Sequence, residues 1–325
     1  MKNQAWQVES FGENAKWQEV AIDKPKQGQV LIQNHYSSIN YKDALGFTSR
    51  GKIFRSFPMV GGIDLAGEVV ESKSEEFKIG DQVIVTGTGL GENYPGGYAA
   101  YTLVDAENIV ALPKGISTRQ AMIIGTAGFT AALAIHRMQS LGQANDLPIL
   151  VSGASGGVGS FATLLLSKGA YTVHALSGKS QAHEYLEALG ASKVVNLEDL
   201  NLGDKPLDKI RYSGCIDNVG GDFLAKILPY IDLYGNLASI GLAGGHKFQT
   251  NVMPFILRGV SIIGISSNNA PMNMRKEIWH SLANHLDEKD FARLKVEEIP
   301  LQDIDQHMQR YFQRKVMGRL LVKIK

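Results

Sequence analysis

The sequence predicts an α/β protein in which a doubly wound parallel sheet accompanies a separate β-rich region. Residues 147–169, LPILVSGASGGVGSFATLLLSKG, combine a short apolar run, a glycine cluster and helical periodicity. From there to about residue 265, segments typical of strands and helices alternate, as a parallel sheet requires. Residues 1–114 instead show short alternating segments separated by glycine turns, which indicates a β-rich, partly barrel-like domain.

Composition narrows the class of protein. The 325 residues are enough for two domains, and 44% are hydrophobic and 20% charged, without a run of eighteen apolar residues. The net charge of +1 gives no reason to expect nucleic acid or an anionic membrane surface as a partner. The first ten residues, MKNQAWQVES, have no apolar core of a secretion signal, so a cytoplasmic location is expected.

The single cysteine, Cys215, excludes an intramolecular disulfide and a cysteine-based zinc cluster. It lies in SGCIDNVGG, which is typical of a strand leading into a turn, so we expect a buried packing residue. The eight histidines are scattered and form no H-E-x-x-H pattern. No metal site is therefore predicted.

The glycine cluster predicts a dinucleotide site. Its spacing is G-x-x-G-G-x-G from Gly153 to Gly159, between an apolar strand and a helix that Gly169 ends. Such a turn lets the backbone approach a pyrophosphate, and the helix start offers free N–H groups. The alternative is an ordinary glycine-rich turn between a strand and a helix.

The next segment, YTVHALSGK at 171–179, indicates which dinucleotide binds. An NAD site would place an acidic residue here for the ribose 2′-hydroxyl, but Ser177, Gly178 and Lys179 stand there instead. A hydroxyl and a cation suit a 2′-phosphate, so NADPH is predicted over NADH. The alternative is that Lys179 is a solvated loop lysine.

The remaining elements follow from local patterns. Early strands are expected at 30–36, 65–70, 82–85 and 98–104. Ser117 and Gln120 have the spacing of a capping box, and the GTAG of 125–128 should break the helix before a second one at 129–141. Further strands are expected at 193–196, 215–218, 236–240 and 260–265, which gives six parallel strands.

Two glycine-containing segments, 219–221 and 242–245, should border the cofactor, because ligands bind at the carboxyl ends of such strands. Beyond residue 266 we expect a helix at 274–286, a strand at 295–299, a helix at 301–312 and a terminal strand at 319–324. This terminal segment is too short for a domain of its own. It is expected to pack back onto the β-rich region.

Six ordered segments carry a resemblance to a known family: INYKDAL (39–45), GIDLAGEV (62–69), IGTAGFTAAL (124–133), SGASGGVGS (152–160), GLAGG (241–245) and PFILRGVSIIGI (254–265). Together they resemble the zinc-free branch of the medium-chain dehydrogenase/reductases, within it the acrylyl-CoA reductase and quinone oxidoreductase group. The resemblance implies a GroES-like catalytic domain at 1–116 and 290–325, a Rossmann NADP-binding domain at 117–289, and a homodimer. Zinc-dependent relatives carry Gly-His-Glu where this chain has Gly62-Ile63-Asp64, so no zinc is expected.

The resemblance also implies the site residues. Tyr41 and Lys42, with Asp43 beside them, are expected near the nicotinamide as catalytic residues. Cofactor contacts are expected at Tyr41, Thr126, Gly153, Ser155, Gly156, Gly157, Val158, Ser177, Gly178, Lys179, Leu242, Ile256, Ser267 and Arg314. Two departures stand out: similar sequences often read Gly-Val/Ile-Asp-Ser where this chain has GISS at 264–267, and asparagine is usual where Arg314 stands.

The expected reaction is hydride transfer from NADPH to the β-carbon of an α,β-unsaturated carbonyl compound, with acrylyl-CoA as the leading substrate. Lys42 or a ribose hydroxyl would stabilise the enolate oxygen, and Tyr41 or water would protonate the α-carbon. Alternatively, Tyr41 only stacks on the nicotinamide and Lys42 pairs with Asp43. Arg50, Lys52 and Arg55 would bind the CoA phosphates, or form an ordinary solvated loop.

Two other functions stay open at this point. An NADPH:quinone oxidoreductase would need a broader apolar cleft and no cations for CoA. A non-catalytic NADPH-binding protein would bind the cofactor without reducing any acceptor. The expected partners are thus an enoyl-CoA, an enone or a quinone.

Overall fold

The computed structural model describes residues 2–325, and the chain divides into two compact units. The first comprises the chain as far as Thr126 together with Ser267–Asp287 and Val296–Lys325; the second comprises Ala127–Ser266 and Glu288–Lys295. The limits predicted from sequence lie at 116/117 and 289/290. They differ from the limits of these units, and the domain assignment stays a prediction.

The first unit is built on a mixed seven-stranded sheet. The strand order is β15-β16-β3-β5-β6-β8, and β7 also pairs with β3. The strands are β3 (Gln29–Ile39), β5 (Asp64–Ser72), β6 (Gln82–Thr86), β7 (Tyr101–Asp105), β8 (Val110–Ala111), β15 (Val296–Pro300) and β16 (Arg319–Lys323). All pairs except β15 with β16 are antiparallel, so the strands expected in the N-terminal region are confirmed.

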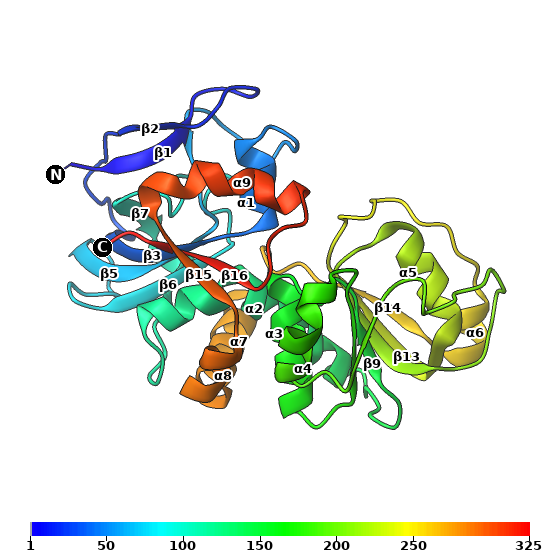
Figure 1. Cartoon of the computed structure of the whole chain (residues 1–325). Helices are drawn as coiled ribbons and strands as arrows, with labels where there is room; N and C mark the ends of the chain where they lie inside the picture. Colours follow the sequence, from blue (N-terminus) through cyan, green and yellow to red (C-terminus); the bar gives the residue numbers. More distant parts are fainter. Residues whose placement is uncertain (1) are drawn as a thin grey trace. The chain divides into compact units, whose positions relative to one another are not determined.

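The C-terminal strand lies beside an N-terminal one. β16 pairs with β3 in the register Leu320↔Ile39 and Val322↔Ser37, and Figure 1 shows the red strand next to the blue one. The prediction that the terminal segment returns to the β-rich region is confirmed. A small antiparallel sheet, β2-β1-β4, was not predicted; its strands are β1 (Gln4–Val8), β2 (Lys16–Glu19) and β4 (Met59–Val60).

Short helices cover this unit. They are α1 (Tyr41–Phe47), the 3₁₀ turn η1 (Ala106–Asn108), α7 (Met272–His285), η4 (Leu301–Asp303) and α9 (Ile304–Phe312). Ile39, Phe47, Met59, Tyr98 and Leu320 belong to one buried core cluster. Helices α1 and α9 pack side by side against it (Figure 1), which places the segment 39–45 on a rigid base.

Helix α2 (Thr118–Ser140) runs across the limit between the two units and starts as predicted. The backbone amide of Ser117 donates to Oε1 of Gln120 at 2.8 Å, and the Gln120 amide donates to Oγ of Ser117 at 3.2 Å. Gly125 breaks the helix with φ 49° and ψ −159°. Among residues 2–325, α2 alone is long and apolar enough to cross a membrane, but 72% of its most apolar window is buried, as in the core helix of a globular fold.

The second unit contains a six-stranded parallel sheet with helices packed on it. The strand order is β11-β10-β9-β12-β13-β14. Its strands are β9 (Ile149–Val151), β10 (Val173–Leu176), β11 (Lys193–Val195), β12 (Tyr212–Asp217), β13 (Ile231–Ser239) and β14 (Ser261–Gly264). The order reverses between β9 and β12, which is the topological switch point of a Rossmann fold. The predicted six-stranded doubly wound sheet is confirmed.

The helices of this unit follow the strands. They are α3 (Gly157–Lys168), η2 (Ser180–Ala182), α4 (His183–Ala188), α5 (Gly221–Ile227), η3 (Leu228–Tyr230), α6 (Met253–Arg258) and α8 (Glu288–Arg293). Lys168 binds Asp290 at 2.5 Å and so holds α8 to α3. Cys215 is fully buried in β12, and burial raises the pKa of its thiol, so its predicted packing role is confirmed.

Candidate active site and nucleotide-binding turn

A strand, a glycine turn and a helix follow one another from β9 into α3. The backbone amide of Gly156 donates to the carbonyl oxygen of Gly153 at 3.0 Å, which closes the turn. The first hydrogen bond of the helix runs from the Ser160 amide to the Gly156 carbonyl at 2.9 Å. The amides of Gly157, Val158 and Gly159 precede that bond and therefore lack intrahelical acceptors, as a bound anion requires.

Two glycines fit this turn for steric reasons. Gly153 has φ +56°, the left-handed conformation that favours glycine. A Cβ at Gly159 would collide with the carbonyl oxygen of Gly153 and with Ala154, so the helix can approach the turn only without a side chain. The residues present therefore fit a dinucleotide pyrophosphate.

The residues predicted for a 2′-phosphate lie together at the end of β10. The hydroxyls of Ser155 and Ser177 are 3.4 Å apart, and the backbone amide of Lys179 donates to Oγ of Ser177 at 3.3 Å. Both serines are buried, Gly178 is exposed and Lys179 is half-buried. The structure thus joins the glycine turn to the segment 177–179, as the sequence led us to expect.

A carboxylate that the sequence analysis missed organises the neighbouring strand end. Asp217 ends β12 and is fully buried; it accepts the Ser152 hydroxyl at 2.6 Å and the amides of Val219 and Gly220 at 2.9 Å. Burial raises the pKa of Asp217. Because it joins β9 to the turn 219–221, this aspartate shapes the switch point; its place directly before N-V-G-G was the available signal.

The other two predicted cofactor residues of this unit are exposed. Leu242 follows β13 and is 57% exposed, and Ile256 on α6 is 72% exposed. The amide of Gly245 donates to the Leu242 carbonyl at 3.0 Å, and Gly245 also pairs with Gly220. The two glycine segments that were expected to border the cofactor are therefore in mutual contact.

In the first unit, helix α1 carries the predicted catalytic residues. Asn40 precedes the helix, and its backbone amide donates to Oδ2 of Asp43 at 2.8 Å. Oδ1 of Asp43 accepts the amide of Ile63 at 3.0 Å. The Asp43 carboxyl group is buried, and its bonds to these two amides fix the start of α1.

Tyr41 and Lys42 differ in their surroundings. The ring of Tyr41 is half-buried and meets the edge of Phe312, with centroids 5.7 Å apart, and no hydrogen bond to its hydroxyl occurs within residues 2–325. Nζ of Lys42 lies 2.5 Å from Oε1 of Glu92. The alternative pairing of Lys42 with Asp43 is therefore wrong, and Glu92 is a further residue that sequence analysis missed.

Asp64 is the centre of a buried polar network beside α1. Oδ2 accepts the hydroxyl of Ser38 at 2.6 Å, the side-chain amide of Asn40 at 2.7 Å and the backbone amide of Thr126 at 2.9 Å. Oδ1 accepts the Thr126 hydroxyl at 2.5 Å, and Nη2 of Arg319 lies 3.8 Å from Oδ2. Asp64 and Arg319 are 0% and 2% exposed, so the pair is protected from solvent. Asp64 stood in the motif GIDLAGEV, but no role had been assigned to it.

The electrostatics of this network act on Asp43. Burial raises the pKa of Asp43 to about 7, and the negative charge of Asp64 adds to the shift. Amide groups of Asn40 and Ile63 oppose it by binding the ionised form. Burial and the charge of Asp64 therefore both favour the protonated form of this α1 side chain.

The last two predicted cofactor residues of this unit lie on its later segments. The carbonyl of Ser267 accepts Nη2 of Arg275 at 2.8 Å, and Nη1 of this buried arginine binds the carbonyl of Thr86 at 2.6 Å. Burial lowers the pKa of Arg275 to about 10. Arg314 is exposed at the end of α9 with φ +55°.

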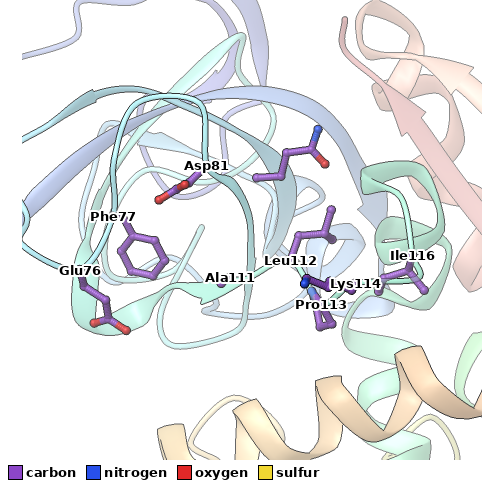
Figure 2. A pocket seen from close by; sticks show the side chains of 9 residues that line it. Glu76, Phe77, Asp81, Ala111, Leu112, Pro113, Lys114 and Ile116 are labelled. Atoms are coloured by element: carbon purple, nitrogen blue, oxygen red, sulfur yellow. The ribbon is translucent and has the colours of Figure 1, made fainter.

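Two open pockets lie elsewhere in the first unit. The larger has a volume of about 450 Å³ and is lined by residues of 76–82 and 111–116, among them Phe77, Asp81 and Lys114 (Figure 2). The smaller is lined by residues of 298–302 and 323–325. Neither contains a predicted site residue. Across residues 2–325, no group of three or more His, Cys, Asp or Glu side chains is arranged to hold a metal ion.

Two family models match successive parts of the chain. Residues 26–114 match the alcohol dehydrogenase GroES-like domain, and residues 157–284 match the domain described as zinc-binding dehydrogenase. The chain is 44% identical over 299 residues to "Probable acrylyl-CoA reductase AcuI" of Escherichia coli, covering 92% of each protein. The chain belongs to the zinc-free branch of the medium-chain dehydrogenase/reductases.

Other medium-chain reductases are also similar to the chain. "Putative quinone oxidoreductase YhfP" of Bacillus subtilis is 41% identical over 304 residues, covering 93% of this chain and 92% of that protein. A crystal structure of B. subtilis yhfP with NAD bound has a TM-score of 0.94 at 38% identity, covering 99% of both chains. The yhdH oxidoreductase of Salmonella enterica in complex with NADP has a TM-score of 0.93 at 41% identity, covering 99% of this chain and 100% of that one. The family predicted from the six motifs is confirmed.

Proposed function

We propose that this chain is an NADPH-dependent reductase that converts acrylyl-CoA to propionyl-CoA. The observation that carries this proposal is the joined arrangement of the glycine turn at 153–159 with Ser155, Ser177 and Lys179. It offers backbone N–H groups for a pyrophosphate and polar side chains for a 2′-phosphate. The similarity to an acrylyl-CoA reductase supports the acceptor.

The balanced reaction consumes one NADPH and one proton for each acrylyl-CoA and yields NADP⁺ and propionyl-CoA. NADPH, when bound, would supply a hydride to the β-carbon of the substrate. This addition breaks the carbon–carbon π bond and leaves negative charge on the carbonyl oxygen of the thioester. The α-carbon then takes up the proton.

The residues of α1 would handle that charge and that proton. Lys42 keeps two of its three N–H donors beyond the bond to Glu92, so its ammonium group can donate to the enolate oxygen. The Tyr41 hydroxyl, which no residue of 2–325 binds, can deliver a proton to the α-carbon. The Asp43 bonds to Asn40 and Ile63 hold both side chains at the helix start.

A second candidate function is reduction of quinones, which the name of the B. subtilis relative supports. The two functions are distinguished by following NADPH oxidation at about 340 nm. Acrylyl-CoA and 1,4-benzoquinone are assayed in parallel as acceptors, with NADH as the control cofactor. We expect acrylyl-CoA with NADPH to give the highest kcat/KM. Preference for benzoquinone would replace the proposed acceptor, and binding of NADPH without turnover of either would favour a non-catalytic role.

We further propose a homodimer formed through the second unit. β14 is an edge strand of the parallel sheet, the segment just before it exposes Val252, Ile256 and Leu257, and the adjacent strand β13 exposes Tyr234. The Tyr234 ring lies against Gly259, which follows α6 and leads into β14, so this exposed ring adjoins the start of the edge strand. Native mass spectrometry should give twice the 35.4 kDa chain mass.

A cytoplasmic location belongs to the same proposal. The one cysteine, Cys215, is buried and forms no disulfide, which suits a reducing compartment. Fractionation of cells that produce the protein should recover NADPH-dependent activity with the cytoplasmic fraction. Recovery with membranes or in the medium would contradict this assignment.

A further inference from the structure

The loop that follows α1 carries three exposed cations. Arg50, Lys52 and Arg55 lie between α1 and β4, and no carboxylate of residues 2–325 pairs with any of them within 4 Å. The nearby acidic residue, Glu92, forms an ion pair with Lys42, whose Nζ lies 2.5 Å from Oε1. The carbonyl of Glu92 accepts the Arg55 amide at 2.9 Å, which anchors this end of the loop. The loop therefore presents positive charge that the fold leaves unneutralised.

A second cationic segment adjoins this loop. The Arg50 guanidinium lies over the ring of Phe312 with its carbon 4.2 Å from the centroid, and Nη2 of Arg50 is 3.5 Å from Oε1 of Gln309. Arg314 and Lys315 follow Phe312 after one intervening residue, Gln313, and are also exposed without an ion pair within residues 2–325. We call these five residues the cationic surface: Arg50, Lys52, Arg55, Arg314 and Lys315.

The cationic surface is continuous with the proposed catalytic helix. One face of Phe312 contacts Arg50, and its ring also meets the edge of Tyr41 at 5.7 Å between centroids. A single aromatic ring thus separates the cation from the tyrosine. A substrate whose reactive end lies at Tyr41 would extend its other end toward this surface.

The backbone conformation of Arg314 independently indicates that its cation has a function. Its φ is +55°, and the amides of Arg314 and Lys315 bind the carbonyls of Tyr311 and Arg310 at 3.2 and 2.9 Å. This is a Schellman ending, in which glycine or asparagine is favoured over arginine. A cation suits the negative end of a helix, but that effect is confined to its last turn and does not account for Lys52 and Arg55.

We propose that the cationic surface binds the phosphate groups of a coenzyme A moiety, so that the acyl acceptor is a CoA thioester. This inference rests on the proposed reductase function and adds the part of the protein that recognises the carrier. Arginine suits the task, because its planar guanidinium binds two phosphate oxygens at once. In this proposal Arg314 binds the substrate, whereas the family resemblance implied that it contacts the cofactor.

Two substrates with the same reactive end provide the test. Acrylyl-CoA carries the phosphates, and the acrylyl thioester of N-acetylcysteamine lacks them. Both are assayed with NADPH in the wild type and in the variant R50Q/K52Q/R55Q. We expect the wild type to favour acrylyl-CoA at least tenfold in kcat/KM, and the variant to lose that advantage while it reduces the truncated thioester at the wild-type rate.

Matched variants and probes locate the effect. The control K24Q/K26Q/K73Q removes three exposed lysines from other loops of the same unit and should keep the wild-type preference. R314N should raise KM for acrylyl-CoA and leave KM for NADPH unchanged. The acrylyl thioester of 3′-dephospho-CoA lacks the ribose phosphate and therefore distinguishes its binding from that of the pyrophosphate. Inorganic phosphate should compete with acrylyl-CoA but not with the thioester of N-acetylcysteamine.

Each outcome has a distinct meaning. If the wild type reduces both thioesters equally well, or if the triple variant weakens both alike, the cationic surface does not recognise CoA, although the reductase function stands. A rise of KM for NADPH in R314N or the triple variant would assign these cations to the cofactor and overturn the inference. If neither thioester is reduced while benzoquinone is, the proposed function itself fails.

Discussion

Asp64 binds Thr126 through both carboxylate oxygens: Oδ1 accepts the threonine hydroxyl at 2.5 Å and Oδ2 accepts its backbone amide at 2.9 Å. Thr126 directly follows Gly125, where α2 is broken, and Asp64 also holds Asn40 at the start of α1. One buried carboxylate therefore fixes two segments that carry predicted site residues. The nearby Arg319 supplies the opposite charge.

Replacing Asp64 by Asn should lower the free energy of unfolding by about 3–5 kcal/mol, because Arg319 would stay buried without its charge partner. Urea titration measures the loss. The double variant D64N/R319M should lose less than the sum of the two single losses, because it removes both charges. E68Q on the same strand is the control, and a D64N loss no larger than that of E68Q would contradict the importance of the network.

The stability of the protein should depend on pH through Asp43. Its pKa rises from 3.8 to about 7 on folding, chiefly because of burial, so the folded state favours the protonated acid. The stability that this acid contributes is complete below about pH 4 and is lost as the pH rises through 7. The stability of the wild type relative to D43N should therefore fall between pH 4 and pH 7 and level off above, and a flat difference would rule out this titration.

Substitution of Gly159 by Ala should damage the nucleotide turn. The added Cβ would meet the carbonyl oxygen of Gly153 and the backbone of Ala154, and relief of that overlap costs about 1–3 kcal/mol. The variant should unfold at lower urea concentration and show a raised KM for NADPH. Gly178→Ala adds the same methyl group where nothing lies within 4 Å, and it should change stability little.

The choice between NADPH and NADH should depend on Lys179. Loss of one charge-assisted hydrogen bond in Lys179→Gln should reduce the preference for NADPH over NADH by about 10- to 100-fold. Parallel kcat/KM measurements with the two cofactors give this ratio. Lys193→Gln, at an exposed position of β11, is the matched loss of charge, and an equal change in both variants would exclude a specific role for Lys179.

The hydroxyl of Tyr41 should matter to turnover. In Tyr41→Phe the packing against Phe312 is retained, and loss of the proton donor should lower kcat for acrylyl-CoA about 100-fold with little change in KM. Tyr36→Phe, on β3 of the same unit, is the control. Full activity of the Tyr41 variant would leave the proton to water and reduce the role of the ring to positioning.

Many elements of both units could be predicted because their signals are local. The glycine turn, the capping box of Ser117 and Gln120, and the six parallel strands each occupy a few neighbouring residues whose periodicity shows in the sequence. The first small sheet was missed because β1 and β2 have no clean alternation and are half-exposed. The six ordered motifs were enough to indicate the family, which the comparisons confirm.

The sequence by itself determined the fold class and the glycine turn. Its one cysteine and scattered histidines gave no pattern that predicts a metal site. Only the tertiary structure decided the partners of the charged groups. Glu92 reaches Lys42 across 50 residues and Thr126 reaches Asp64 across 62, and no local pattern encodes such contacts. The physical reason is burial. A charge that folding removes from water needs a hydrogen-bonding or oppositely charged partner, and residues far apart in the sequence can supply it.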